Sequence, residues 1–323
     1  MTPGMPLAKP HLLSQYRKAA RQDGRSESGT EVEGVVYVET DVRYDEPRGD
    51  VSVWAKGPLD EITFLRRAAE GQYDSRDADM LLGLVPWAPM DQSTPVLENY
   101  LRLAEEAAGQ ETWRRVKGFR FLLQFIHDQA KFKKLVLGDS FIANLKMIGA
   151  RDLSFDIGVD QRSGGSWQLE TIARAMEKAH EGVAEDQKVI FIVNHLCKPD
   201  FEASKDEFQR WCDATTSMSK LSRTSVKLSG AFSELPSRLR EPSEIAVHLR
   251  PWVSHLMRSF GSSRIMFGSD WPVCNVAGPL GEDSWVAWKD VITAVLDDKE
   301  HGMTENDCSS ILSGTARTAY RLN

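Results

Sequence analysis

Three side chains that can do chemistry each follow a short apolar run. Asp270 ends the run RIMFGSD, His195 follows VIFIV, and Arg120 ends KGFR. A carboxylate can accept a proton, and an imidazole can act as acid, base or metal ligand near neutral pH. A guanidinium can bind a carboxylate or an oxygen on which negative charge builds. If the three runs are strands of one sheet, these groups form a candidate catalytic site.

The same residues also have plain structural explanations. Asp270 fits an Asx-type turn after a strand, and His195 fits a histidine hydrogen-bonded within a loop. Arg120 fits an ion pair with an acidic residue on a helix. Lys227, at the end of another apolar run, is predicted to extend its ammonium group to solvent. Local pattern alone does not decide between these readings.

Apolar runs of strand length alternate with longer amphipathic segments of helical period along the chain. This alternation predicts an α/β fold with parallel strands, and a TIM-like (β/α)₈ barrel is its commonest closed form. Seven strands are found, so one strand of the barrel, the first, is missing or replaced. An open doubly wound sheet remains an alternative, although no GxGxxG turn follows a strand. The predicted strands are Gly34–Val38, Met80–Pro86, Val116–Phe121, Leu153–Ile157, Val189–Asn194, Ser225–Leu228 and the run that ends at Asp270.

Polar or aromatic side chains stand at the carboxyl end of every predicted strand. In a closed barrel these ends meet at one mouth, where reacting groups are displayed. Residues 34–323 are therefore expected to form one barrel domain, preceded by an amino-terminal segment, 1–33, that is helical around Ser14–Arg21 or irregular. The side chains at the strand ends are Glu39, Trp87, Arg120, Asp156, Asn194 with His195, Lys227 with Ser229, and Asp270.

Composition restricts the class of partner. The chain has 323 residues and a net charge of -7, with 47 acidic and 40 basic side chains spread without long blocks. Nucleic acid, which calls for a concentrated basic face, is not expected as a partner, and no apolar stretch is long enough to span a membrane. Four separated cysteines and an amino terminus without a signal-peptide pattern favour the cytoplasm. A small-molecule substrate is expected, and a homo-oligomer is compatible with the sequence.

Four motifs in this order resemble the amidohydrolase-related (amidohydrolase 2) family, and in particular its sugar-lactonase branch of L-rhamnono- and L-fucono-lactonases. They are KGFRFLLQ at 117–124, NHLCKP at 194–199, VKLSG at 226–230 and FGSDWP at 267–272. The resemblance implies a (β/α)₈ barrel that hydrolyses a cyclic ester in carbohydrate metabolism. It also implies that Asp270 assists the attacking water, that His195 orients or polarises the reacting groups, and that Arg120 binds the substrate carbonyl.

One family motif has no counterpart here. The family carries His-x-His at the end of its first strand, whereas no two of the seven histidines in this chain are spaced by two. Because Pro6–His11 resembles the segment after that strand, the chain is expected to begin beyond it. His195 and Asp270 are then the remaining candidate metal ligands, fewer than the three usual for catalytic zinc. The cofactor is accordingly either one divalent metal, such as zinc, or none.

The sequence-based hypothesis is a lactonase in which Asp270 is the base. Glu39, Lys198 and Trp271 are expected to line the sugar pocket, and activity is expected to suffer from the missing histidines. Two alternatives stay open. One is a metal-dependent decarboxylase of the same superfamily, and the other is a catalytically degenerate or truncated paralogue.

Overall fold

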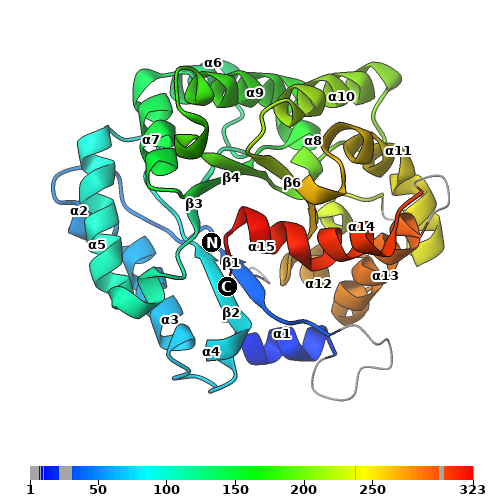
Figure 1. The fold of residues 1–323 in the computed structure, drawn as a ribbon, viewed down its shortest axis with the longest axis horizontal. Helices are drawn as coiled ribbons and strands as arrows, with labels where there is room; N and C mark the ends of the chain where they lie inside the picture. Colours follow the sequence, from blue (N-terminus) through cyan, green and yellow to red (C-terminus); the bar gives the residue numbers. More distant parts are fainter. Residues whose placement is uncertain are drawn as a thin grey trace.

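Parallel strands form the centre of the molecule, and helices lie around them (Figure 1). This computed structural model describes residues 7, 9, 11–21, 31–236, 238–297 and 302–322. Parts of the predicted amino-terminal segment, residues 1–6, 8, 10 and 22–30, lie outside the described residues, and so do three positions of Pro6–His11. The strands of the described chain are β1 Val35–Val38, β2 Leu81–Val85, β3 Gly118–Leu122, β4 Ser154–Gly158, β5 Ile190–Val193, β6 Thr224–Leu228 and β7 Ile265–Phe267.

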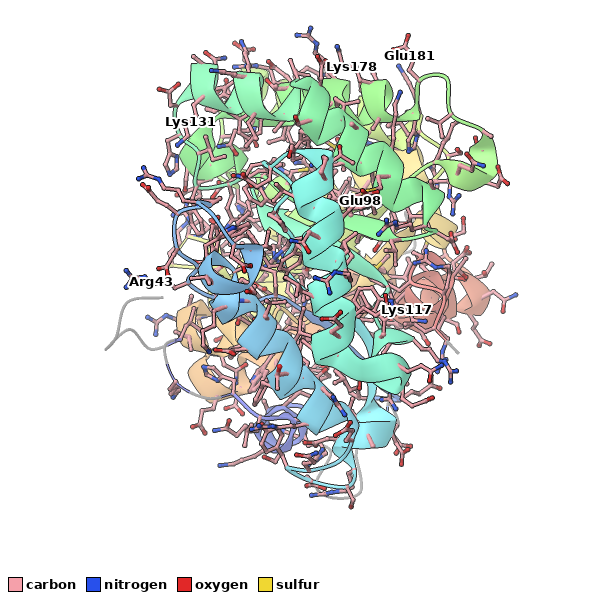
Figure 2. All side chains as sticks on the ribbon, turned by 90° about the vertical axis from the view of Figure 1, so that its left-hand side faces the viewer. Arg43, Glu98, Lys117, Lys131, Lys178 and Glu181 are labelled. Carbon is pink, nitrogen blue, oxygen red and sulfur yellow. The ribbon has the colours of Figure 1, made fainter. Side chains whose placement is uncertain are left out.

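Helices follow the strands, as the alternation of the sequence predicted. The longer ones carry one apolar face against the strands and one charged face toward solvent. Figure 2 shows Glu98, Lys131 and Lys178 pointing outward from the helix layer. The helices are α1 Leu13–Ala19, α2 Val51–Trp54, α3 Lys56–Ala69, α4 Asp77–Met80, α5 Thr94–Trp113, α6 Gln129–Val136, α7 Asp139–Ala150, α8 Gln161–Gly164, α9 Ser166–His180, α10 Lys205–Ser219, α11 Pro242–Phe260, α12 Val273–Ala277, α13 Ser284–Leu296, α14 Glu305–Ser309 and α15 Thr315–Ala319.

The strand register decides which side chains face the inside of the barrel. β1 pairs with β2, and β3 to β7 pair in chain order, every pair parallel. Bridges from Leu84 to Val116 and from Trp87 to Arg120 connect β2 with β3. Arg120 is paired with Asp156, which is paired with Ile192, so these side chains share one face. The fold is the TIM-like barrel that the sequence predicted, and this face is its interior.

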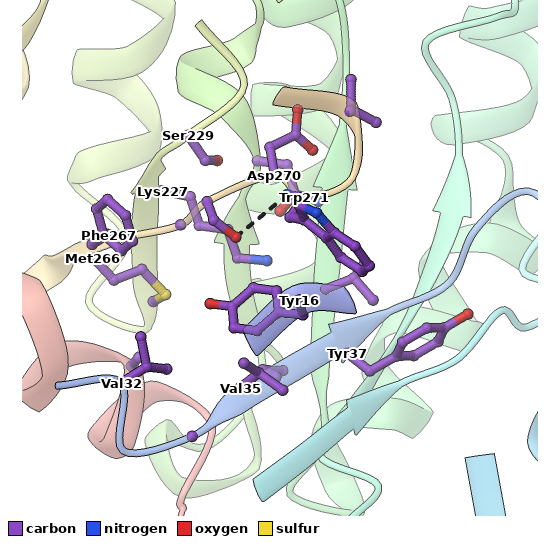
Figure 3. Close-up of a pocket in the computed structure, with 18 of the residues that line it drawn as sticks. Tyr16, Val32, Val35, Tyr37, Lys227, Ser229, Met266, Phe267, Asp270 and Trp271 are labelled. Carbon is purple, nitrogen blue, oxygen red and sulfur yellow. Dashed lines mark hydrogen bonds between the residues drawn. The ribbon is translucent and has the colours of Figure 1, made fainter. Parts of the chain in front are cut away.

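Helix α1 lies at the junction between β1 and β7, where the described residues show no strand pairing. Its Tyr16 packs edge-on against Trp271 and Trp285, with ring centroids 5.5 and 6.0 Å away. Val35 of β1 and Phe267 of β7 belong to the same apolar cluster. Figure 3 shows Tyr16 between the two strands. An aromatic side chain from α1 thus occupies a place where backbone pairing would otherwise continue the barrel.

A buried ion pair fixes α1 in this place. Arg17 is 5% exposed and contacts Asp77 Oδ1 at 2.8 Å and Asp74 Oδ2 at 2.6 Å, both just before β2. Removing one partner of a buried pair leaves an uncompensated charge. We therefore expect Arg17→Met to lower the free energy of unfolding by about 3 kcal/mol in urea denaturation. The control is Arg114→Met, whose ion pair with Glu111 is exposed, with an expected change below about 1 kcal/mol. Equal effects of the two substitutions would contradict this role of Arg17.

Helix α15 covers the end of the barrel at which the strands begin (Figure 1). Arg321, just after it, donates to the Lys117 carbonyl at 2.7 Å, and Tyr320 inserts its hydroxyl into the interior, 2.7 Å from Asp156 Oδ2. Lys227 donates to the same Asp156 oxygen at 2.7 Å. The prediction that Lys227 extends to solvent is therefore wrong, because the residue is 9% exposed and its ammonium group is held inside the barrel.

Within the described part of the chain, none of the helices combines the length and the apolarity needed to cross a bilayer.

Candidate active site

Asp270 stands three residues beyond β7, in a tight turn. Its φ is 55°, and the peptide bond between Trp271 and Pro272 is cis. The indole of Trp288 donates to the Gly268 carbonyl at 2.9 Å and holds the strand end in place. In the described part of the chain, no protein group donates a hydrogen bond to the Asp270 carboxylate. Burial raises the pKa of this carboxyl to about 7, although the cations of Lys198, Arg120 and Lys227 oppose the shift. A carboxylate with this pKa is suited to accept a proton near neutral pH.

His195 follows β5 at a point where the chain turns sharply. Four successive residues, His195 to Lys198, have positive φ and fold the imidazole back over the barrel mouth. Its Nε2 lies 3.6 Å from Asp270 Oδ1, and its Nδ1 lies 2.8 Å from Ser229 Oγ. Burial lowers the pKa of His195 well below its ordinary value, and the nearby Arg120 adds to the shift. The ring is therefore neutral at physiological pH and offers one donor and one acceptor nitrogen.

Arg120 is held by Glu39 from the end of β1. Its Nε donates to Glu39 Oε1 at 2.7 Å, and its Nη2 donates to the Glu39 carbonyl oxygen at 2.6 Å. The second carboxylate oxygen of Glu39 accepts from the Asp41 backbone N–H at 2.6 Å. Both oxygens of Glu39 are thus engaged within the protein. The Nη1 of Arg120 has no hydrogen-bond partner among the described residues, so it is the nitrogen that can bind a ligand.

Lys198 and Trp271 lie on the rim. The ammonium group of Lys198 is 2.9 Å from Glu234 Oε1 and 3.7 Å from Asp160 Oδ2. Trp271 follows Asp270 directly and is packed edge-on by His11 as well as Tyr16, with a His11 centroid distance of 5.4 Å. Their expected roles in substrate binding stay predictions.

A single cavity of about 2070 Å³ contains all the predicted site residues. Its polar end is at the carboxyl ends of the strands, and an apolar branch extends toward the junction of β1 and β7, past Val32, Val35 and Phe267 (Figure 3). The structure therefore brings into one cavity the candidate site residues that the sequence predicted. Residues on its walls and rim are Glu39, Arg120, His195, Lys198, Asp270 and Trp271.

Tyr16 is a wall residue that the sequence reasoning missed. It lies outside every predicted strand end, and burial raises its pKa to about 12, so the phenol stays neutral. His11 lines the same cavity through its contact with Trp271. A helix at this position was expected from Ser14–Arg21, but no local pattern places its side chains against a loop some 250 residues later in the chain.

The donor set does not fit a catalytic zinc with three protein ligands. His195 and Asp270 are close enough to share an ion, but no group of three or more His, Cys, Asp or Glu side chains suited to a metal is found among the described residues. We accordingly expect that dialysis against a chelator leaves the catalytic rate of the purified protein unchanged within about twofold. A large loss that added zinc reverses would contradict this expectation.

Comparison with known proteins gives a consistent result. The model of the amidohydrolase family matches residues 73–322. An L-rhamnono-gamma-lactonase from Scheffersomyces stipitis is 27% identical over 334 residues, which covers 99% of this chain and 92% of that protein. An L-fucono-1,5-lactonase from Burkholderia multivorans is 27% identical over 84% of this chain and 80% of its own length.

Among solved structures, an amidohydrolase from Burkholderia multivorans with bound zinc superposes with a TM-score of 0.70. The two chains are 22% identical, and the match covers 98% of this chain and 90% of the other. At this identity the likeness concerns the fold, and it agrees with the barrel described above.

Proposed function

Because the chain belongs to the amidohydrolase family, we propose that it is a hydrolase that opens a sugar-acid lactone by adding water to the ester carbonyl. The observation that carries this proposal is the largely buried Asp270 carboxylate, whose pKa is about 7 and which lies 3.6 Å from a neutral imidazole. Similarity over 99% of the chain to a protein named as a lactonase supports the class of substrate.

Asp270 is the general base in this mechanism. It takes a proton from water as the water oxygen bonds to the carbonyl carbon. The tetrahedral intermediate then breaks its bond to the ring oxygen, and protonated Asp270 returns the proton to that leaving oxygen. The product is an open-chain hydroxy acid, and Asp270 is again a carboxylate. A base whose pKa is near the working pH is efficient in both directions of this transfer.

His195 orients the water and the base. If Nε2 carries the ring proton, Nδ1 accepts from the Ser229 hydroxyl, which lies 2.8 Å away. The Nε2–H group then faces the space beside Asp270 Oδ1 and can hold the water or the polarised carbonyl. This role requires an imidazole ring that is neutral and fixed in position. Burial keeps the His195 ring neutral, and the hydrogen bond with Ser229 fixes its orientation.

Arg120 stabilises the negative charge that builds on the carbonyl oxygen. Glu39 holds two of its nitrogens, so the third is presented in a fixed direction, and a preorganised donor of this kind favours the transition state. Lys198 and Trp271 line the rim, where an indole face and an ammonium group suit a ring that carries hydroxyls. The decarboxylase alternative needs a firmly held metal, which the donor set does not favour.

The direct test is hydrolysis of L-rhamnono-γ-lactone and L-fucono-1,5-lactone by the purified protein, followed by acid release with a pH indicator. We expect turnover of at least one lactone above the spontaneous rate, and turnover lowered by about 100-fold or more in an Asp270→Asn preparation purified in parallel. A rate equal to the spontaneous rate with both lactones would contradict the proposal and would favour a catalytically degenerate paralogue.

A further inference from the structure

Asn194 is a buried polar side chain without a partner. The residue is 1% exposed, and neither its Oδ1 nor its Nδ2 has a hydrogen-bond partner within the described residues. A buried amide left unpaired is costly, and native proteins satisfy the great majority of such groups with protein, water or ligand. Asn194 belongs to the wall of the cavity, and a small rotation of its side chain would turn the covered carboxamide toward a molecule that enters there.

The strand register places this carboxamide on the inner face of the barrel. Ile190 and Ile192 of β5 belong to the cluster inside the barrel, and Asn194 continues their alternation toward the mouth. Asn194 lies one residue beyond the pair of Val193 with Val226, so it stands beside Lys227 of β6.

The position beside Asn194 on the other neighbouring strand is glycine. Asn194 donates its backbone N–H to the Ile157 carbonyl at 2.9 Å, which brings Gly158 next to it. A Cβ added at Gly158 would make only ordinary contacts, at 3.4 Å to Gln124 Oε1 and 3.8 Å to Leu122. A methyl-sized group would therefore fit beside Asn194 without forcing these neighbours to move.

We infer that Asn194 is a specificity-determining residue that hydrogen-bonds a hydroxyl on the ring of the lactone. This inference rests on the proposed function. A carboxamide donates and accepts, as a hydroxyl does, so the two groups can satisfy each other. The side chain has no basicity, and it is set deeper than His195 on the same strand end, so it binds the ring and leaves the reacting carbonyl to Asp270 and Arg120. The class of substrate is accordingly a polyhydroxylated lactone with one hydroxyl toward the barrel floor.

The test compares the natural ring with analogues that each lack one hydroxyl. For wild-type protein, we expect kcat/KM to fall about 10- to 100-fold for one monodeoxy lactone, the one that leaves Asn194 unpaired. In Asn194→Leu, the parent lactone and that analogue should be turned over with equal kcat/KM. The loss should appear mainly in KM for the parent lactone. Ile192→Val, one inward position deeper, is the control and should keep the wild-type discrimination.

A stability measurement separates ligand binding from a structural role. Because the amide has no partner in the free protein, Asn194→Leu should not lower Tm. A lowered Tm together with unchanged discrimination among the deoxy lactones would overturn the inference while leaving lactone hydrolysis intact. Wild-type protein that opens none of the lactones would contradict the proposed function, and this inference with it.

Discussion

Asp270→Asn should lower kcat/KM for lactone opening by about 10²- to 10⁴-fold, the range typical for loss of a positioned general base. Asparagine keeps the shape of the side chain and its place beside His195, so substrate binding should change little. The loss should therefore be seen in kcat. Initial rates with the better of the two lactones measure it, and Asp213→Asn, on the exposed face of α10, is the matched control with an expected effect below about twofold.

The same substitution should stabilise the fold at high pH. The pKa of Asp270 is raised from 3.8 to about 7, so the folded protein prefers the neutral acid. The contribution of this group to the free energy of unfolding is fully present below pH 3.8 and is lost as pH rises through about 7. The total loss is up to about 4 kcal/mol. The Tm of Asp270→Asn relative to wild type should thus increase between pH 4 and pH 8. If the difference in Tm between Asp270→Asn and wild type does not change with pH, the raised pKa of Asp270 in the folded protein is contradicted.

Gly230→Ala should lower activity by about 10²-fold, because it moves His195. Gly230 has a φ of +69°, and a Cβ there would lie 2.6 Å from Cγ and Nδ1 of the imidazole. The ring must shift away from this contact and from its hydrogen bond with Ser229. Because the neighbouring atoms belong to a ring held on both sides, the shift displaces it relative to Asp270.

Gly182→Ala separates this effect from backbone strain. Gly182 has nearly the same φ, +68°, and a Cβ there would have no atom within 4 Å. Both substitutions should cost about 1 kcal/mol or more of stability, because alanine disfavours the left-handed conformation. Only Gly230→Ala should lose activity in rate assays with the same lactone. Equal activity of the two variants would contradict the position given to His195.

The strands were predictable from the sequence because buried parallel strands give continuous apolar runs. Residues 189–194, for example, contain β5, Ile190–Val193. The junction between β1 and β7 was not predictable. It depends on Tyr16 of α1, whose partner Trp271 lies some 250 residues further along the chain, and on Arg17, whose partner Asp77 lies 60 residues further along. Local periodicity carries no information on such pairings.

The candidate site was predictable to the extent that it follows from strand ends. Asp270, His195 and Arg120 reach one cavity because parallel strands bring their carboxyl ends to the same mouth. Charge partners were not predictable in the same way. Lys227 was placed in solvent because its local pattern is that of a lysine at a strand end, whereas Asp156, 71 residues away, holds it inside. The full engagement of Glu39 by Arg120 and Asp41 also depends on contacts across the barrel.

The pH dependence of kcat/KM for wild-type protein tests the central claim most directly. Spontaneous opening of the lactone is measured at each pH and subtracted. We expect activity to rise with one ionisation near pH 7 and to stay level above it, since Asp270 must be a carboxylate and the lowered pKa of His195 keeps its ring neutral in that range. If kcat/KM is already level at pH 5 and does not change up to pH 8, the assignment of Asp270 as the general base is contradicted.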